Sequence, residues 1–576
     1  MKKLLLLGAA ILAASAVQAS RDDPERTVIT RQLEVVEGRD FMVAAANPHA
    51  VRAGQKVLQA GGSAIDAAVA VQTTLGLVEP QSSGIGGGAF IMYWSAKEGK
   101  LYTLDARERA PAAASPDQFY VNGKPLSWRE AIVGGMSVGV PGVVKGLERA
   151  HQRFGKLPWA SLFEHPIDLA TRGFEVSPRL ARLVAMKLHP GLTQIAPGKD
   201  YFYPNGQAIA AGSVLRNPAY ANTLQQIAEQ GSDAFYRGGF AEQLVATVRN
   251  APINPGRLSE QDLASYEPTW REPLCGPYRM YTVCGMMPPS SGGLAVLQIM
   301  GILQHFPLSQ YSAESADLWH LYSQASRVAF ADRERYAADG DFVDIPLQAL
   351  LAPHYLQSRA DSIDINKDMG KASPFVVEQA FSYADDDSYS LPSTSHMVII
   401  DAEGNAVSMT TSIEMAFGSS LMVGGFLLNN QLTDFSLSYE KDGVLVANRV
   451  QPRKRPRSSM APTVVLKDGV PVLLVGSPGG TRIINYVAKT LLAHLDLGMD
   501  IQAAVNLANV SHTNGNALML EQGVASEALA EELRAKGHTV QVRDMNSGVH
   551  AIAIQGERLF GAADPRREGA VATVPN

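Results

Sequence analysis

The chain has 576 residues, of which 46% are hydrophobic and 18% are charged, and its formal net charge is −6. This length allows a large buried core, built either as several domains or as one two-layer core with long insertions. The weak negative charge gives no reason to expect a nucleic-acid partner, and the short basic cluster Arg453-Lys454-Arg455 is interpreted as a solvated loop.

Residues 1–19 have the pattern of a secretory signal peptide. Met1-Lys2-Lys3 is basic, residues 4–14 are apolar, and Val17-Gln18-Ala19 is a small-x-small cleavage pattern. The apolar run is too short to cross a membrane, and no later run reaches about 18 uninterrupted apolar residues. We therefore expect an exported protein, periplasmic or secreted, without a membrane span.

Two helices are expected next. One runs from Pro48 to the Gly61-Gly62 stop, and the other runs to about residue 77 from a capping-box pattern formed by Ser63 and Asp66. After them, Gly84, Gly86 and Ala89 match the spacing of a dinucleotide fingerprint. That fingerprint needs a strand before the glycines and a helix after them, whereas here the order is reversed. The glycines are interpreted instead as points where two main chains approach closely.

Two polar residues follow with competing interpretations. Arg107 comes after an expected strand at 101–105, where it is either an ordinary ion-pair residue or a group that binds a substrate carboxylate. Ser137 lies in Gly135-Met136-Ser137-Val138-Gly139, which matches the nucleophile elbow of a serine hydrolase. The apolar stretch before it is too short for the required strand, so a chance match is favoured, and Ser137 remains a competing nucleophile.

Residues 141–380 are expected to be mostly helical, with helices near 141–154, 218–230, 239–249, 293–305 and 315–338. Cys275 and Cys284 are the two cysteines of the chain, and Gly276-Pro277 forms an expected turn between them. A cross-strand disulfide and two free thiols remain about equally open.

The stretch Pro392-Ser393-Thr394-Ser395-His396 lies where an acidic polar segment meets an expected hairpin of strands 397–400 and 406–413. A hydroxyl here can attack its own preceding carbonyl, and cleavage would give Thr394 a free α-amino group. Because such an amine has a reference pKa of about 7.7–8.0, it can serve as the base for the adjacent hydroxyl. The alternative is an ordinary polar linker entering a hairpin. His396 is interpreted as a packed strand residue.

Further along the chain, residues 424–430 are expected to form a buried strand, and residues 464–466 and 472–475 a hairpin. Ser477-Pro478-Gly479-Gly480-Thr481 then opens a helix over 482–495. Glycines between a strand and a helix N-terminus aim free amides at an anion. Since the lysine of a phosphate loop is missing, an oxyanion hole fits better than a nucleotide site, with a plain strand-to-helix turn as the alternative. No zinc-ligand spacing appears, and neither a metal nor a cofactor is expected.

Taken in order, these segments resemble the γ-glutamyltransferase (γ-glutamyl transpeptidase) family of N-terminal-nucleophile hydrolases. The resemblance covers nearly all of the mature chain and rests on residues 82–89, Asp105-Ala106-Arg107-Glu108, residues 288–293, Thr394-Ser395-His396, Leu428-Asn429-Asn430-Gln431, Asp434-Phe435-Ser436, residues 456–460, residues 476–480 and Asp564-Pro565-Arg566. It implies an α+β fold, a four-layer αββα sandwich with a mostly helical insertion. It also implies self-cleavage between Ser393 and Thr394 into a large subunit (20–393) and a small one (394–576) that stay together.

The resemblance further implies a reaction and its residues. Thr394 would take the γ-glutamyl group of a donor such as glutathione as an ester and pass it to water, an amino acid or a peptide. By this resemblance, Arg107, Ser458 and Ser459 would bind the donor's α-carboxylate, and Gln431 and Asp434 would bind its α-ammonium. The amides of Gly479 and Gly480 would form the oxyanion hole. A zwitterionic head group needs partners of both charges, so this set is chemically consistent.

Two positions depart from the family pattern. Ser412 stands where many members have a threonine that supports the nucleophile, which keeps a hydroxyl. Glu414 stands where the best-known members have an asparagine that contacts the ammonium, which leaves donor specificity open. Relatives that act as cephalosporin (glutaryl) acylases use a donor without the amine, and such an acylase is the alternative function. A carboxylate beside an empty ammonium site is costly to desolvate, which favours glutamyl donors.

Overall fold

The computed structural model describes residues 32–376, 383–386, 388, 391 and 393–574, so the expected signal peptide at 1–19 lies outside the described residues. Two seven-stranded sheets form its centre. The first runs in the order β1 (Val36–Gly38), β24 (Arg558–Ala563), β23 (His550–Gln555), β19 (Val470–Gly476), β18 (Thr463–Lys467), β11 (Tyr281–Gly285) and β10 (Leu274–Tyr278). The second runs β25 (Ala570–Thr573), β2 (Met42–Ala45), β12 (Ser395–Ile400), β13 (Ala406–Ser412), β3 (Gly88–Ser95), β4 (Lys100–Ala106) and β9 (Thr269–Arg271).

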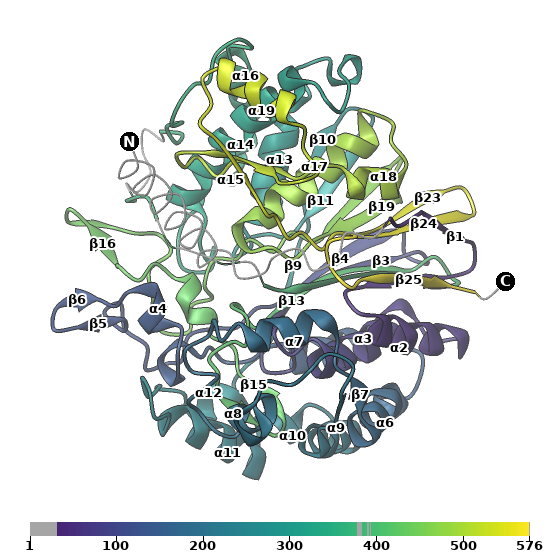
Figure 1. Ribbon diagram of the computed structural model, residues 1–576, viewed down its shortest axis with the longest axis vertical. Helices are drawn as coiled ribbons and strands as arrows, with labels where there is room; N and C mark the ends of the chain where they lie inside the picture. The colour runs from purple at the N-terminus through teal and green to yellow at the C-terminus, as the bar shows by residue number, and fades with distance from the viewer. Residues whose placement is uncertain (1–31, 377–382, 387, 389–390, 392, 575–576) are drawn as a thin grey trace, which may run out of the picture.

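Helices cover the outer face of each sheet, which gives four layers (Figure 1). On the second sheet lie α2 (Pro48–Gln59), α3 (Ala64–Val78) and α5 (Val143–Phe154). On the first lie α13 (Gly292–Leu303), α17 (Ile483–Leu495) and α18 (Ile501–Asn506), with α14 (Ala316–Tyr336) packed on α13. The expected α+β sandwich of αββα layers is confirmed.

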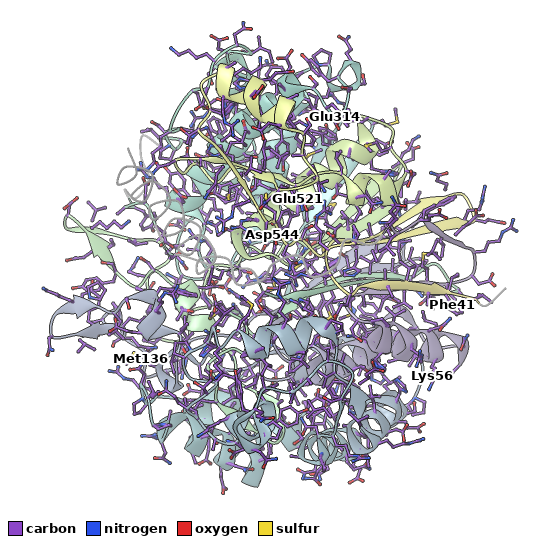
Figure 2. The ribbon with its side chains drawn as sticks, viewed as in Figure 1. Phe41, Lys56, Met136, Glu314, Glu521 and Asp544 are labelled. Atoms are coloured by element: carbon purple, nitrogen blue, oxygen red, sulfur yellow. A yellow bond between two sulfur atoms is a disulfide. The ribbon has the colours of Figure 1, made fainter. Side chains whose placement is uncertain are left out.

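Apolar side chains fill the space between these layers (Figure 2). Met42, Phe90, Val398, Leu474 and Ile552 come from both sheets and belong to one buried cluster. Burial of such surface contributes about 25 cal/mol per Å², which makes the packed sheets the rigid base of the molecule.

The chain between β4 and β9 is the expected helical insertion. Its elements are β5 (Tyr120–Val121), β6 (Lys124–Pro125), α4 (Trp128–Ala131), α5, α6 (Glu164–Arg172), β7 (Phe174–Glu175), α7 (Pro178–Ala185), α8 (Gly198–Phe202), β8 (Val214–Leu215), α9 (Pro218–Gln230), α10 (Asp233–Tyr236), α11 (Gly238–Arg249) and α12 (Glu260–Ala264). The remaining elements are α15 (Leu347–Leu350), α16 (Pro353–Asp361), α19 (Glu527–Ala535), β14 (Met422–Val423), β15 (Phe426–Leu427), β16 (Glu440–Lys441), β17 (Val444–Leu445), β20 (Val510–Ser511), β21 (Leu518–Glu521) and β22 (Val540–Arg543). No helix of the described residues has the length and apolar character that a bilayer crossing requires.

Local sequence signals account for several of these boundaries. The Ser63 and Asp66 side chains form the expected capping box at the start of α3. The glycines before β3 serve close approach of main chains, since a Cβ on Gly87 would lie 2.1 Å from the carbonyl oxygen of Ser412. Cys275 and Cys284 lie directly opposite each other on β10 and β11 and form a disulfide. The expected strand over 424–430 is wrong: β15 covers two residues there, because positive φ angles at Gly424 and Gly425 turn the chain.

Candidate active site

Thr394 lies directly before β12, at the end of the central hairpin of the second sheet. Ser395 pairs with Thr411 across this hairpin, which places Thr394 beside Ser412. The Thr394 hydroxyl donates to Ser412 Oγ over 3.1 Å, and the same oxygen accepts from the Glu414 amide at 2.9 Å. The sheet thus fixes the orientation of the candidate nucleophile.

The backbone of Thr394, directly after the expected cleavage point, adopts an unusual conformation. Thr394 has φ of 90°, in the left-handed region where a β-branched side chain is a genuine outlier. A conformation of this kind costs on the order of 1–3 kcal/mol. The carbonyl oxygen of Ser393 accepts a hydrogen bond from the Gly479 amide at 3.1 Å. Backbone strain at Thr394 and polarisation of the Ser393 carbonyl by the Gly479 amide both favour attack on that carbonyl.

A small cavity opens beside Thr394. Its walls contain every residue that the resemblance assigned to the donor head group, together with the expected nucleophile and its neighbour. The lining residues are Arg107, Leu391, Thr394, Ser412, Glu414, Gln431, Asp434, Ser458, Ser459, Met460, Gly480 and Ile483. Segments far apart in the sequence therefore meet at one site.

The two charged groups expected to bind the donor contact each other in the cavity. Arg107 Nη2 lies 2.5 Å from Asp434 Oδ2, and Gln431 Nε2 donates to the same oxygen at 2.8 Å. Arg107 also donates to the carbonyl oxygens of Pro456 and Arg457 and is fully buried. A charge-assisted bond of this geometry holds both groups in place at the base of the cavity.

Ser458 and Ser459 line the cavity, and the hydroxyl oxygen of each accepts a hydrogen bond from the protein. Ser458 Oγ accepts from the Met460 amide at 3.1 Å, and Ser459 Oγ accepts from Arg333 Nη2 at 2.7 Å. Because a hydroxyl has one proton and two lone pairs, each serine keeps its O–H for another acceptor. This pair of donors suits a carboxylate.

Glu414 is buried at φ of 77° with neither carboxyl oxygen hydrogen-bonded to a described residue. Burial raises the pKa of Glu414 well above its ordinary value, and the negative charge of Asp434 raises it further. Burial and the nearby charge of Asp434 therefore both favour the protonated form of the Glu414 carboxyl group. A bound ammonium would favour its ionised form.

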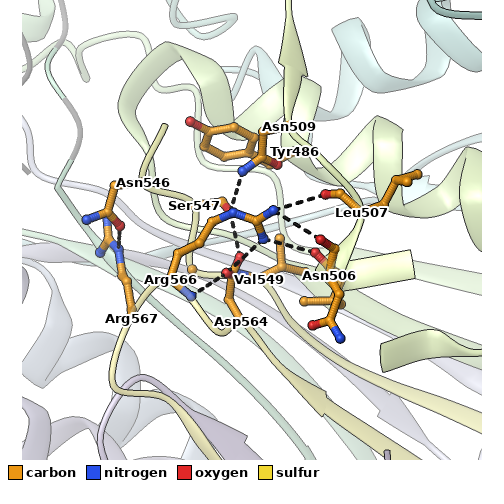
Figure 3. Close-up of polar contacts among 12 residues, drawn as sticks. Tyr486, Asn506, Leu507, Asn509, Asn546, Ser547, Val549, Asp564, Arg566 and Arg567 are labelled. Carbon is orange, nitrogen blue, oxygen red and sulfur yellow. Dashed lines mark hydrogen bonds and ion pairs between the residues drawn. The ribbon is translucent and has the colours of Figure 1, made fainter. Parts of the chain in front are cut away.

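The region behind the nucleophile contains two arginines next to each other in the sequence (Figure 3). Arg566 donates to Asp564 at 3.1 Å and to Glu521 at 2.5 Å, in a fully buried network. Arg567 Nε donates to Asn546 at 2.7 Å, and its Nη1 donates to the carbonyl oxygen of Thr394 at 3.2 Å. Arg567 thus holds the main-chain carbonyl of the candidate nucleophile in place.

Arg333 and Arg567 were missed by the sequence reasoning. The motif Asp564-Pro565-Arg566 points to the neighbourhood of Arg567 but not to its contact with Thr394. Arg333 lies inside the long helix α14, where arginine is ordinary, so the sequence holds no signal for its role.

Ser137 lies in a short 3₁₀ turn (Gly135–Ser137) and not between a strand and a helix. Its buried hydroxyl is 3.1 Å from the carbonyl oxygen of Gly134, to which it donates. It does not line the cavity at Thr394. The geometry that a serine nucleophile elbow requires is therefore missing at this position.

His396 is fully buried, with Nδ1 2.9 Å from Thr410 Oγ1. Burial lowers the pKa of His396 well below its ordinary value, so the ring is neutral. This environment matches the expected packed strand residue.

Comparisons with known proteins agree with this geometry. A family model described as Gamma-glutamyltranspeptidase matches residues 50–574. The glutathione hydrolase proenzyme of Bacillus subtilis (strain 168) is 40% identical over 553 residues, which cover 94% of this chain and 92% of that protein. The acylase ACY 1 proenzyme of Pseudomonas sp. (strain SE83) is 32% identical over 562 residues, covering 95% and 96%. The crystal structure of cephalosporin acylase from Bacillus halodurans superposes with a TM-score of 0.85 at 29% identity, covering 95% of this chain and 98% of that one. The chain belongs to the gamma-glutamyltranspeptidase family of enzymes.

Proposed function

We propose that the chain is a precursor that cuts itself between Ser393 and Thr394. The observation that carries this proposal is the scissile peptide itself, with Thr394 at φ of 90° and the Ser393 carbonyl bound to the Gly479 amide. The Thr394 oxygen attacks the Ser393 carbonyl carbon, the bond to the Thr394 nitrogen breaks, and the nitrogen takes up a proton. Water then hydrolyses the resulting ester, which leaves a carboxylate on Ser393 and a free α-amino group on Thr394.

The processed enzyme uses the same residue for substrate chemistry. The Thr394 α-amine takes the hydroxyl proton as the oxygen attacks the γ-carbonyl of the donor. The amide C–N bond then breaks, the ammonium of Thr394 returns the proton to the leaving amine, and a γ-glutamyl ester remains on Thr394. Gly479 and Gly480 supply the oxyanion site, because cleavage frees the Gly479 amide from the Ser393 carbonyl. One such donor contributes about 3 kcal/mol of transition-state stabilisation. Water or the amine of an amino acid or peptide then accepts the glutamyl group.

The donor in this proposal is a γ-glutamyl amide such as glutathione. Its α-carboxylate binds Arg107 and the two serine hydroxyls, and its α-ammonium binds Asp434, Gln431 and Glu414. The proposal is supported by the meeting of all six residues in one cavity and by the relative named as a glutathione hydrolase proenzyme. The subunits are residues 20–393 and 394–576 of one exported precursor.

A glutaryl acylase on the same fold is the second candidate. It is favoured by the raised pKa of Glu414, because a protonated carboxyl beside an empty ammonium site carries no charge to desolvate. Relatives named as acylases are consistent with it. Asp434 is an argument against a glutaryl donor. It lies in the cavity in an ion pair with Arg107, and a glutaryl group has no ammonium for it to bind.

The two candidates are separated by the rates of γ-glutamyl-p-nitroanilide and glutaryl-p-nitroanilide hydrolysis. We expect a higher kcat/KM for the glutamyl compound at pH 7–8. The glutaryl rate should rise relative to it at lower pH, where Glu414 stays protonated. A preference for glutaryl at neutral pH would reject the proposed donor.

A further inference from the structure

Arg333 is a buried cation behind the candidate carboxylate site. It lies on α14, is 4% exposed, and lines a second cavity that also contains Gly479. Among the residues that the structure describes, no carboxylate oxygen lies within 4.0 Å of its guanidinium. Burial, together with the charge of Arg457, lowers the pKa of Arg333 to about 9. Arg333 is therefore still protonated at neutral pH, although an unpaired buried cation is costly.

The guanidinium of Arg333 contacts Ser459 directly and is linked to Ser458 through Ser291. Its Nη2 donates to Ser459 Oγ at 2.7 Å, and its Nε donates to Ser291 Oγ at 2.9 Å. Ser291 in turn donates to the Ser458 carbonyl oxygen from both its amide and its hydroxyl, each at 2.7 Å. One planar, rigid group thus fixes the Ser458–Ser459 main chain and the Ser459 side chain together.

This arrangement decides the direction of the Ser459 hydroxyl proton. Because the oxygen accepts from Arg333, its proton points to another acceptor, and the cavity is on that side. A hydroxyl polarised by a cation is a stronger donor to an anion than a neutral hydroxyl. The charge of Arg333 is thereby transmitted to the place where a carboxylate would bind.

We propose that Arg333 is a positioning residue that sets the affinity and selectivity for the donor's α-carboxylate through Ser459. This inference rests on the proposed γ-glutamyl donor. It adds a second arginine of the large subunit to a carboxylate site built from Arg107 and two serines of the small subunit. It assigns Arg333 no role in bond breaking. Its removal should therefore change KM for carboxylate-bearing donors and leave kcat nearly unchanged.

The test compares two anilides in the processed enzyme and in Arg333→Gln. The first is γ-glutamyl-p-nitroanilide, and the second is 4-aminobutyryl-p-nitroanilide, which keeps the amine but lacks the α-carboxylate. We expect Arg333→Gln to raise KM for the first about tenfold or more, the effect of one charge-assisted hydrogen bond. Its kcat, and the kcat/KM of the second compound, should change less than about threefold. Equal losses on both compounds would overturn the inference.

Two further variants keep the test decisive if Arg333→Gln does not fold or process. Ser291→Ala removes the second anchor of Arg333 without touching the cavity, and it should raise KM for the glutamyl compound selectively by a smaller factor. An unchanged KM in this variant would contradict the proposal. In a Ser459→Ala background, Arg333→Gln should have little additional effect, because both changes break the same contact.

Arg327 provides the matched control. It lies on the same helix, is equally buried, and pairs with Asp368 at 2.8 Å outside the cavity. Arg327→Gln removes a cation from α14 and should leave the ratio of kcat/KM for the two anilides unchanged. A change in this ratio as large as that of Arg333→Gln would reject a specific role of Arg333. A wild-type enzyme that prefers glutaryl over glutamyl donors would reject the proposed function instead, so the two failures are distinguishable.

Discussion

Removal of the Ser412 hydroxyl is a local test of the geometry around the candidate nucleophile. Ser412→Ala deletes the acceptor of the Thr394 hydroxyl at 3.1 Å and of the Glu414 amide at 2.9 Å. Both donors lie in a buried region, where water replaces a lost partner poorly. We expect slower self-processing, a lower kcat and a lower stability of the folded protein.

The magnitude follows from the two lost hydrogen bonds. A buried donor left without an acceptor costs about 1–3 kcal/mol. If the Thr394 contact is needed when its oxygen attacks, the loss corresponds to about 5-fold to 150-fold in rate, since 1.36 kcal/mol is tenfold. Ser412→Thr keeps the hydroxyl and should stay within a few-fold of the wild type.

Processing is measured from the disappearance of the uncut chain on denaturing gels, and kcat from γ-glutamyl-p-nitroanilide hydrolysis by the processed fraction. Ser408→Ala is the control, because Ser408 lies on the same strand, is equally buried, and contacts Val475 instead. It should change neither rate more than about twofold. Wild-type processing and kcat in Ser412→Ala would refute the reasoning.

Three further changes have defined outcomes. Asp434→Ala removes the nearer of the two acidic partners of the buried Arg107, at 2.5 Å against 3.8 Å for Glu108. We expect a loss of about 3–5 kcal/mol in unfolding free energy by chemical denaturation, together with a higher KM for glutamyl donors. Glu414→Gln tests the raised pKa of Glu414. The folded protein retains a proton that the unfolded chain releases above about pH 4.3, so wild-type stability falls as pH rises. The Tm of Glu414→Gln relative to the wild type should therefore increase from pH 5 to pH 8, and a constant difference in Tm would contradict the raised pKa. In Gly479→Ala, the new Cβ lies 2.6 Å from the Tyr486 ring, and residue 479 has φ of 139°. Processing followed on gels should slow about 100-fold. Unchanged processing would exclude the Gly479 amide from the reaction.

Much of the fold was accessible from local sequence signals. The capping box at Ser63, the glycine turn at 403–405 and the strand–glycine–helix order at 476–483 all act within a few residues, so their patterns predict structure directly. The strand expected over 424–430 failed because Gly424 and Gly425 adopt positive φ. Apolar composition alone does not distinguish a buried strand from a buried turn.

The candidate site was accessible in part, and mainly through the family resemblance. Thr394 could be singled out from its position between a linker and a hairpin, but the alternative of a plain linker stayed open. Arg333 could not be found, because its contact with Ser459 joins positions 126 residues apart. The protonation of Glu414 also could not be read from sequence, since burial and the distance to Asp434 decide it.

N-terminal sequencing of the purified, active protein shows whether Thr394 becomes the N-terminus of the small subunit. We expect two chains on a denaturing gel, the smaller one beginning Thr-Ser-His-Met, and a single uncut chain in Thr394→Ala. An active wild-type protein in which the Thr394 nitrogen remains in a peptide bond would contradict the account.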